Sequence, residues 1–286
     1  EERAALGDFL DREGRAWSPD LARIAESAGA WSTAADRPEA LRDALKKALP
    51  AGDAVSPSHV QSYASCPLAY FMQRVLRLTA LDTPEDEEAI DAGRRGTIIH
   101  QILFRLFTSL KERGMAPLTQ GNLAAARALL DEAATGVFAE AETEGVNGYA
   151  MLWEIEKERI REDLGGMLGA EAEAGDEGWI PAHFELRFGM ERHRGESGSG
   201  EDAASTARPV SVDMAPGAAL AIKGRIDRVD LSADGRAARI TDYKTGKLTH
   251  YKDDELRGGT TVQLPLYMLA VARLLLRLPE SDREDI

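Results

Sequence analysis

Residues 223–247 have the sequence KGRIDRVDLSADGRAARITDYKTGK, in which apolar and charged positions alternate on both sides of a turn signal. The turn signal is Asp234-Gly235, and alternation around it predicts a β-hairpin. Asp242 and Lys244 are two positions apart on the second strand, so their side chains leave the same face. Asp227 lies on the first strand of the hairpin. The stretch therefore predicts that two carboxylates and a lysine converge.

This group of side chains suits metal-assisted hydrolysis of a phosphodiester bond. Carboxylate oxygens are the ligands that Mg²⁺ prefers, and the ion keeps several waters while it contacts a phosphate. Such an ion polarises the phosphoryl oxygen and lowers the pKa of a bound water. A neighbouring ammonium orients that water or neutralises charge that develops in the transition state. An Asp-Tyr-Lys triplet is also common surface composition, so the triplet alone does not define the site.

The remaining chain predicts helices before and after a small sheet. Apolar residues recur at helical spacing in four stretches, residues 93–114, 123–142, 151–174 and 260–278. They alternate with polar residues over 183–190, which is typical of a strand. We expect residues 1–52 to be a helical segment or linker from a longer parent protein, and residues 53–286 to be one domain. The order of elements predicts an α/β (α+β) fold with helices around a central sheet.

Charge is unevenly distributed along the 286 residues. Lys and Arg number 35 and Asp and Glu 49, a net charge of −14, which excludes a protein that clamps nucleic acid over its whole surface. Residues 223–252 nevertheless hold eight basic and only four acidic side chains. We expect phosphate contacts from this stretch, with Arg225, Arg228 and Lys247 as the DNA-binding residues. A solvated strand face is the simpler explanation of the same charges.

Cysteine and hydropathy exclude several classes of protein. Cys66 is the one cysteine, so this chain alone can form neither an intramolecular disulfide nor a four-cysteine iron–sulfur cluster. The simplest role for Cys66 is that of a small buried hydrophobe. No apolar run approaches the ~20 residues of a transmembrane helix. We therefore expect no membrane partner and a cytoplasmic location.

The hairpin motif, Asp227 followed by Asp242-Tyr243-Lys244, resembles the core of the PD-(D/E)XK nucleases. Further segments in the same order resemble the C-terminal nuclease domain of the RecB and AddB helicase–nucleases. They are Ser56-Pro57-Ser58 with Cys66-Pro67 and Phe71, Gly96 to His100 as a Gly-x-x-x-His helix, and Gln263 with Tyr267 as a Gln-x-x-x-Tyr helix. The resemblance covers roughly residues 55–275 and implies a restriction-endonuclease-like central mixed β-sheet flanked by helices. Cluster-bearing AddB-like members have three further cysteines, which this chain lacks.

The resemblance also implies the metal ligands and the catalytic residues. Asp227 and Asp242 would be metal ligands and, together with Lys244, the catalytic residues. His100 would be a third ligand and the backbone carbonyl of Tyr243 a fourth. Taken alone, a histidine beside an apolar helix face is more often a core or surface residue.

Three further residues match positions of the family near the site. Glu185 matches a carboxylate on the strand before the core, although a solvated strand face would explain it equally well. Gln263 and Tyr267 share a helix face and would contact DNA or brace the metal ligands. Capping and packing of that helix would also explain both residues.

The family implies an Mg²⁺-dependent DNA exonuclease, with Mn²⁺ as a substitute metal and no iron–sulfur cluster from this chain alone. It would be the nuclease module of a helicase–nuclease in double-strand break repair. The implied partners are DNA, in the form of single-stranded ends, and a helicase subunit or helicase-like region of the parent protein. Two alternatives stay open: a nuclease-fold module for DNA binding or assembly without cleavage, and a CRISPR-associated or phage-type exonuclease outside break repair.

Overall fold

A computed structural model of the chain describes residues 54–75, 78, 90–145, 149–175, 178–190, 202–215, 218–245 and 261–276. Internal contacts divide the chain into two compact units. Residues 53–71 and 78–286 form one unit, and residues 1–52 and 72–77 are assigned to the other. The expected N-terminal segment, residues 1–52, and Lys247 lie outside the described residues.

The first sheet contains the predicted hairpin. Strands β2 (Trp179–Phe188), β5 (Gly224–Ser232) and β6 (Ala238–Thr241) are antiparallel in the order β2-β5-β6. The turn between β5 and β6 contains Gly235 with φ of 69°, a conformation that glycine adopts without steric penalty. The hairpin prediction is thus confirmed, and its first strand carries Asp227. Its second strand ends at Thr241, so the expectation that Asp242 and Lys244 lie on that strand is wrong.

A second sheet consists of β1 (Ala54–Val55), β4 (Ala218–Ile222) and β3 (Val210–Ala215), with β1 parallel and β3 antiparallel to β4. The mixed α/β class is confirmed, but two three-stranded sheets stand within the described residues where the sequence predicted one central sheet. The division falls at Lys223, whose backbone N–H bonds the carbonyl of Val55 at 3.0 Å. Only this residue separates β4 from β5, so one continuous segment serves both sheets.

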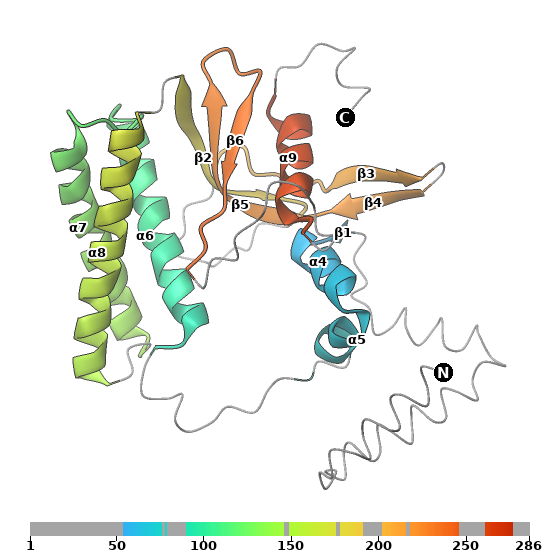
Figure 1. The fold of residues 1–286 in the computed structure, drawn as a ribbon, viewed down its shortest axis with the longest axis horizontal. Helices are drawn as coiled ribbons and strands as arrows, with labels where there is room; N and C mark the ends of the chain where they lie inside the picture. The colour runs from blue at the N-terminus through green and yellow to red at the C-terminus, as the bar shows by residue number, and fades with distance from the viewer. Residues whose placement is uncertain are drawn as a thin grey trace, which may run out of the picture. The chain divides into compact units, whose positions relative to one another are not determined.

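Three helices pack together against the first sheet. They are α6 (Ala92–Glu112), α7 (Leu123–Thr143) and α8 (Ala150–Ala174). The Asp91 side chain caps α6 by accepting two backbone N–H bonds of the first turn at 2.9 Å. The buried stripe of α6 consists of Ile98, Ile99, Ile102, Leu103, Leu106, Phe107 and Leu110. This stripe docks α6, and with it His100, against strand β2 (Figure 1).

Helix α9 (Gln263–Leu274) lies on the other side of the β2-β5-β6 sheet (Figure 1). Its buried residues share a second apolar core with the strands, composed of Leu186, Phe188, Val210, Ile222, Ile226, Val229, Tyr267, Ala270 and Val271. Gly224 permits this packing, because a Cβ there would lie 2.8 Å from the Tyr267 ring. The predicted Gln-x-x-x-Tyr helix is confirmed and starts at Gln263.

The segment before these elements forms short helices. Helix α4 (Pro57–Ser65) starts after its cap Ser56, α5 (Pro67–Tyr70) follows, and the π-helix η2 spans Phe71–Val75. Cys66 lies between α4 and α5 and is exposed, so the prediction of a buried hydrophobe is wrong. Its Sγ instead caps α5 by accepting the N–H of Ala69 at 3.4 Å.

Candidate active site

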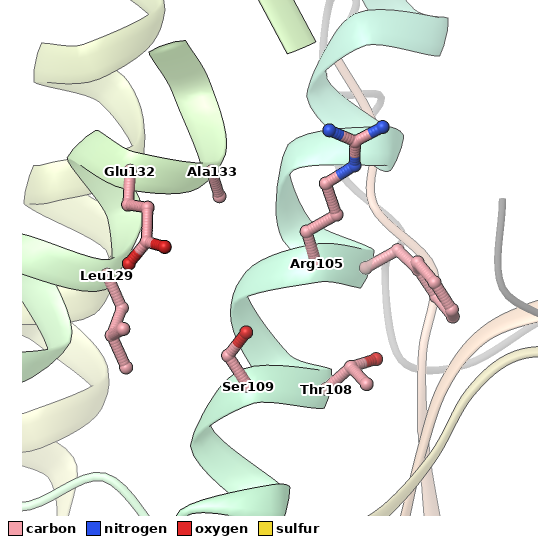
Figure 2. A pocket seen from close by; sticks show the side chains of 7 residues that line it. Arg105, Thr108, Ser109, Leu129, Glu132 and Ala133 are labelled. Carbon is pink, nitrogen blue, oxygen red and sulfur yellow. The ribbon is translucent and has the colours of Figure 1, made fainter. Parts of the chain in front are cut away.

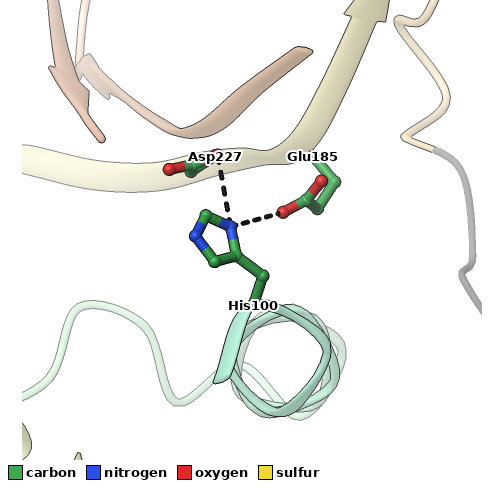
Figure 3. A group of neighbouring side chains, drawn as sticks. All are labelled: His100, Glu185 and Asp227. Carbon is green, nitrogen blue, oxygen red and sulfur yellow. Dashed lines mark hydrogen bonds and ion pairs between the residues drawn. The ribbon is translucent and has the colours of Figure 1, made fainter. Parts of the chain in front are cut away.

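Three side chains from three elements meet at one point, His100 of α6, Glu185 of β2 and Asp227 of β5 (Figure 3). The Nδ1 atom of His100 lies 3.3 Å from Glu185 Oε1 and 3.4 Å from Asp227 Oδ1. One ligand atom of each residue lies within 4.8 Å of the others. This spacing is small enough for a single metal ion to contact all three side chains.

Strand pairing brings the two carboxylates together. Phe184 pairs with Arg228 and Leu186 with Ile226, which places Glu185 level with Asp227 on the neighbouring strand. Glu185 has φ of 52°, a left-handed conformation that costs on the order of 1–3 kcal/mol in a residue with a side chain. It is only 8% exposed, so the alternative of a solvated strand face does not apply.

A glycine lets α6 approach the segment that follows Asp242. A Cβ at Gly96 would lie 3.3 Å from Thr245 Oγ1, closer than most such contacts. His100 follows Gly96 by one helical turn and therefore faces the same region. Glycine at the first position of the Gly-x-x-x-His motif thus has a steric reason, which is the close approach of Thr245.

Three polar contacts set the geometry at the end of the hairpin. The backbone N–H of Tyr243 donates to Asp227 Oδ2 at 2.8 Å, which holds the end of β6 against β5. Lys244 Nζ contacts Asp242 Oδ2, and Gln263 Nε2 donates to Asp242 Oδ1 at 3.1 Å. Asp242 is outside the group formed by His100, Glu185 and Asp227, but it lies close enough for the charge of Asp227 to act on it.

Gln61 of α4 supports the position of Gln263. Its Oε1 atom accepts the backbone N–H of Val262 at 3.2 Å and that of Gln263 at 3.4 Å. Gln61 therefore satisfies two donors at the start of α9, where no intrahelical acceptor exists. No motif in the sequence indicates this role for Gln61, which is separated from Val262 by 201 positions.

The carboxylates determine the protonation of His100. Hydrogen bonding to Asp227 and then to Glu185 raises the pKa of His100 to about 10, and burial opposes this shift. Burial raises the pKa of Asp242, the charge of Asp227 adds to the increase, and Lys244 opposes it. The two carboxylates beside His100 thus favour positive charge between them.

The three predicted DNA-binding residues differ in what the structure shows of them. Arg225 is half-exposed, with its Nε 2.8 Å from Glu185 Oε2, and remains suited to contact a phosphate. Arg228 is 3% exposed, and its guanidinium is bound by Asp230 and Glu171. The prediction that Arg228 contacts DNA is therefore corrected, because a buried and fully paired guanidinium does not reach a ligand. Lys247 is outside the described residues.

A pocket of about 290 Å³ lies elsewhere, between α6 and α7 (Figure 2). Its lining includes Arg105 of α6 and Glu132 of α7. Arg105 is paired with Glu140 at 2.6 Å. None of the predicted site residues lines this pocket, so it is separate from the candidate active site.

The donor atoms at the site fit a divalent cation. Two carboxylates and an imidazole nitrogen converge, and a further carboxylate, that of Asp242, is close by. Carboxylate oxygens suit Mg²⁺ and Mn²⁺, and imidazole is a usual ligand of first-row transition metals.

A model of the PD-(D/E)XK nuclease superfamily matches residues 54–284. The chain belongs to this superfamily, and its mixed α/β architecture is consistent with the restriction-endonuclease-like fold.

The chain is also similar to proteins that are named as a subunit of an ATP-dependent helicase/deoxyribonuclease. It is 28% identical to the one from Desulforudis audaxviator over 77% of this chain and 17% of the relative. It is 27% identical to the one from Carboxydothermus hydrogenoformans over 81% of this chain and 19% of the relative. The match to the one from Symbiobacterium thermophilum is 42% identical over 22% of this chain and 6% of the relative. The chain thus spans less than a fifth of the length of these relatives.

Among the helices in the described part of the chain, none combines the length and the apolar composition needed to cross a bilayer.

Proposed function

We propose that the chain is a divalent-metal-dependent deoxyribonuclease module that uses Mg²⁺ and degrades DNA from single-stranded ends. The observation that carries the proposal is the group His100, Glu185 and Asp227, with the Asp242–Lys244 pair beside it. Membership of a nuclease superfamily supports the reaction class. The buried acidic group supports the metal dependence.

In this proposal the metal is held by Asp227, Asp242, His100 and the backbone carbonyl of Tyr243, with Glu185 as an additional ligand. When bound, a divalent ion supplies Lewis-acid activation of the scissile phosphate and lowers the pKa of a bound water. The hydrogen bond from the Tyr243 N–H orients one oxygen of Asp227 and leaves Oδ1 directed at His100. The hydrogen bond from Gln263 orients Asp242 in the same way.

The remaining polar side chains act on the substrate. The ammonium of Lys244 is half-exposed and neutralises negative charge that develops on the phosphate in the transition state. Arg225 contacts a neighbouring phosphate of the strand, since its guanidinium is half-exposed beside the buried carboxylate of Glu185. Tyr267 is buried against Gly224 and braces the helix that presents Gln263.

The wider role follows from the relatives that this chain resembles. Their name describes a helicase/deoxyribonuclease subunit, and we propose that this chain serves as the nuclease module of such an assembly in double-strand break repair. The proposed partners are a helicase subunit or a helicase-like region of the parent protein. The division into residues 1–52 and a nuclease domain of residues 53–286 is part of the same proposal, and the cytoplasmic location stays a prediction.

The test uses the full chain and internally labelled single-stranded DNA, linear or circular, with Mg²⁺ or with EDTA. We expect Mg²⁺-dependent degradation of the linear strand and resistance of the circular strand. Asp242→Asn and Lys244→Ala should each reduce the rate roughly 100-fold or more. Matched controls are Asp213→Asn, a carboxylate whose side chain is 82% exposed, and Arg113→Ala, whose side chain is 56% exposed.

Near-wild-type cleavage by folded Asp242→Asn or Lys244→Ala would contradict the assignment. Cleavage of the circular strand would contradict the exonuclease mode but would not contradict the proposed metal site. DNA binding without cleavage at any Mg²⁺ or Mn²⁺ concentration would favour a nuclease-fold binding module instead.

A further inference from the structure

We propose that Arg228 is a positioning residue that sets the spacing of three of the proposed metal-binding side chains, His100, Glu185 and Asp227, through a buried stack of planar groups. The stack consists of Arg228, Phe107 and Phe184. The inference rests on the proposed function, because the affected property is the metal affinity of the same site. It reassigns a residue that the sequence placed on a DNA-binding surface.

The guanidinium of Arg228 is held by two carboxylates, those of Asp230 and Glu171. Its Nε and Nη2 atoms lie 2.6 Å and 3.1 Å from the two carboxylate oxygens of Asp230. Its Nη1 and Nη2 atoms lie 3.0 Å and 2.7 Å from the oxygens of Glu171 on α8. Arg228 is 3% exposed and Asp230 is fully buried. Asp230 accepts two of these hydrogen bonds and Glu171 one, with an ion pair to its other oxygen, and together they fix the orientation of the planar guanidinium.

That orientation places the guanidinium over an aromatic pair. Its central carbon lies 4.5 Å from the centroid of the Phe107 ring. Phe107 in turn stacks on Phe184, with centroids 5.6 Å apart and an interplanar angle of 18°. Both rings are at most 4% exposed. The three groups therefore form a continuous column within the core.

Each member of this column is linked to one of the metal-binding side chains. Arg228 directly follows Asp227 on β5, and Phe184 directly precedes Glu185 on β2. Phe107 follows His100 by seven positions on α6, two turns along the same helix face. A displacement within the column moves α6, β2 and β5 relative to one another, and the spacing of the three ligand atoms changes with them.

Arg228 suits this role better than the role of a stabilising residue. A buried ion pair contributes little net stability, because desolvation offsets the attraction, and the role assigned to this one is to fix one arrangement of β5 and α8. Arg239 also contacts Asp230, at 2.8 Å, but it lies over Trp179 and outside the column. Arg239 is therefore a matched control with the same partner and the same side-chain type.

The experiment measures Mn²⁺ affinity of the full chain by calorimetry and by the loss of the free Mn²⁺ signal in electron paramagnetic resonance. Arg228→Lys keeps the charge and removes the planar fork. We expect it to weaken Mn²⁺ binding 10-fold to 100-fold, the usual range for a residue that orients metal ligands. Arg239→Lys should stay within about twofold of the wild type, since it lies outside the column. Excess Mn²⁺ should restore cleavage by Arg228→Lys.

A second variant, Phe107→Leu, removes the ring and keeps an apolar side chain in the core. It should weaken Mn²⁺ binding in the same direction, and it decides the question if Arg228→Lys fails to fold. Folded variants of both kinds with wild-type Mn²⁺ affinity would overturn the inference and leave the proposed function intact. Equal losses in Arg228→Lys and Arg239→Lys would also overturn it. A wild-type chain that binds no Mn²⁺ would overturn the proposed function as well.

Discussion

Metal binding at the candidate site should release a proton from His100. The pKa of His100 is raised to about 10 by Asp227 and Glu185, so the imidazole is protonated at neutral pH. A metal ligand must be a neutral imidazole, and the ion therefore displaces the proton. Because the same two carboxylates favour both cations, metal and proton compete for one place.

The magnitude follows from the distance between the working pH and the pKa. Between pH 7 and pH 9 the apparent affinity for Mn²⁺ should rise about tenfold per pH unit, since one proton leaves for each ion bound. At pH 7 the competition should cost roughly 4 kcal/mol relative to pH 10, at 1.36 kcal/mol for each pH unit. Above the pKa of His100 the dependence should level off.

The assay is calorimetric titration of the full chain with Mn²⁺ in two buffers of different ionisation enthalpy at pH 7. The difference in observed enthalpy counts the protons released, and we expect close to one per ion. His100→Ala is the control, because it should bind Mn²⁺ more weakly and release no proton. A wild-type affinity that is independent of pH between 7 and 9 would refute the reasoning.

Three further predictions concern stability. In the metal-free chain the folded-state pKa of His100 lies above its unfolded value near 6.5. The contribution of His100 to the free energy of unfolding should therefore be complete below pH 6.5 and lost as the pH rises through about 10. Chemical unfolding at pH 6, 8 and 10 measures this decline, and His100→Ala should flatten it. Gly224→Ala should destabilise the fold by ~1–3 kcal/mol in urea unfolding, because its Cβ would lie 2.8 Å from the Tyr267 ring, and an unchanged midpoint would contradict this packing. Ile102→Ala should cost ~2–5 kcal/mol, since Ile102 is fully buried, whereas Ile155→Ala at 45% exposure should change the unfolding free energy by under about 0.5 kcal/mol.

Features that depend on neighbours in the chain were predictable. The Asp234-Gly235 turn joins β5 to β6, where the alternation on either side predicted a hairpin. The apolar spacing of α6 predicted the stripe that is buried in the structure. Asp242 and Lys244 were expected on one face of the second strand; they lie just after its end at Thr241, although their side chains are in contact. Turn geometry and helical periodicity act over a few residues, so a local pattern contains them.

Burial of charged strand residues was not predictable in the same way. Glu185 alternates with apolar neighbours and Arg228 follows Asp227 on its strand, and both patterns are equally compatible with a solvated face. Helices α6 and α8 cover these positions, since Phe107 lies on the guanidinium of Arg228 and Glu171 binds it. The covering elements come from distant parts of the sequence, so only the folded chain determines which charges are removed from water.

At the candidate site, too, the sequence identifies the residue types and the tertiary structure decides how they are arranged. Motif spacing identifies the residue types that a metal and a phosphate require, because their chemistry is a property of each side chain. The position of Glu185 level with Asp227 depends on the register of β2 and β5, and the support of Gln263 by Gln61 depends on the meeting of α4 and α9. Such contacts form between segments far apart in the sequence, and packing of the whole domain selects them from many arrangements that the local patterns would allow.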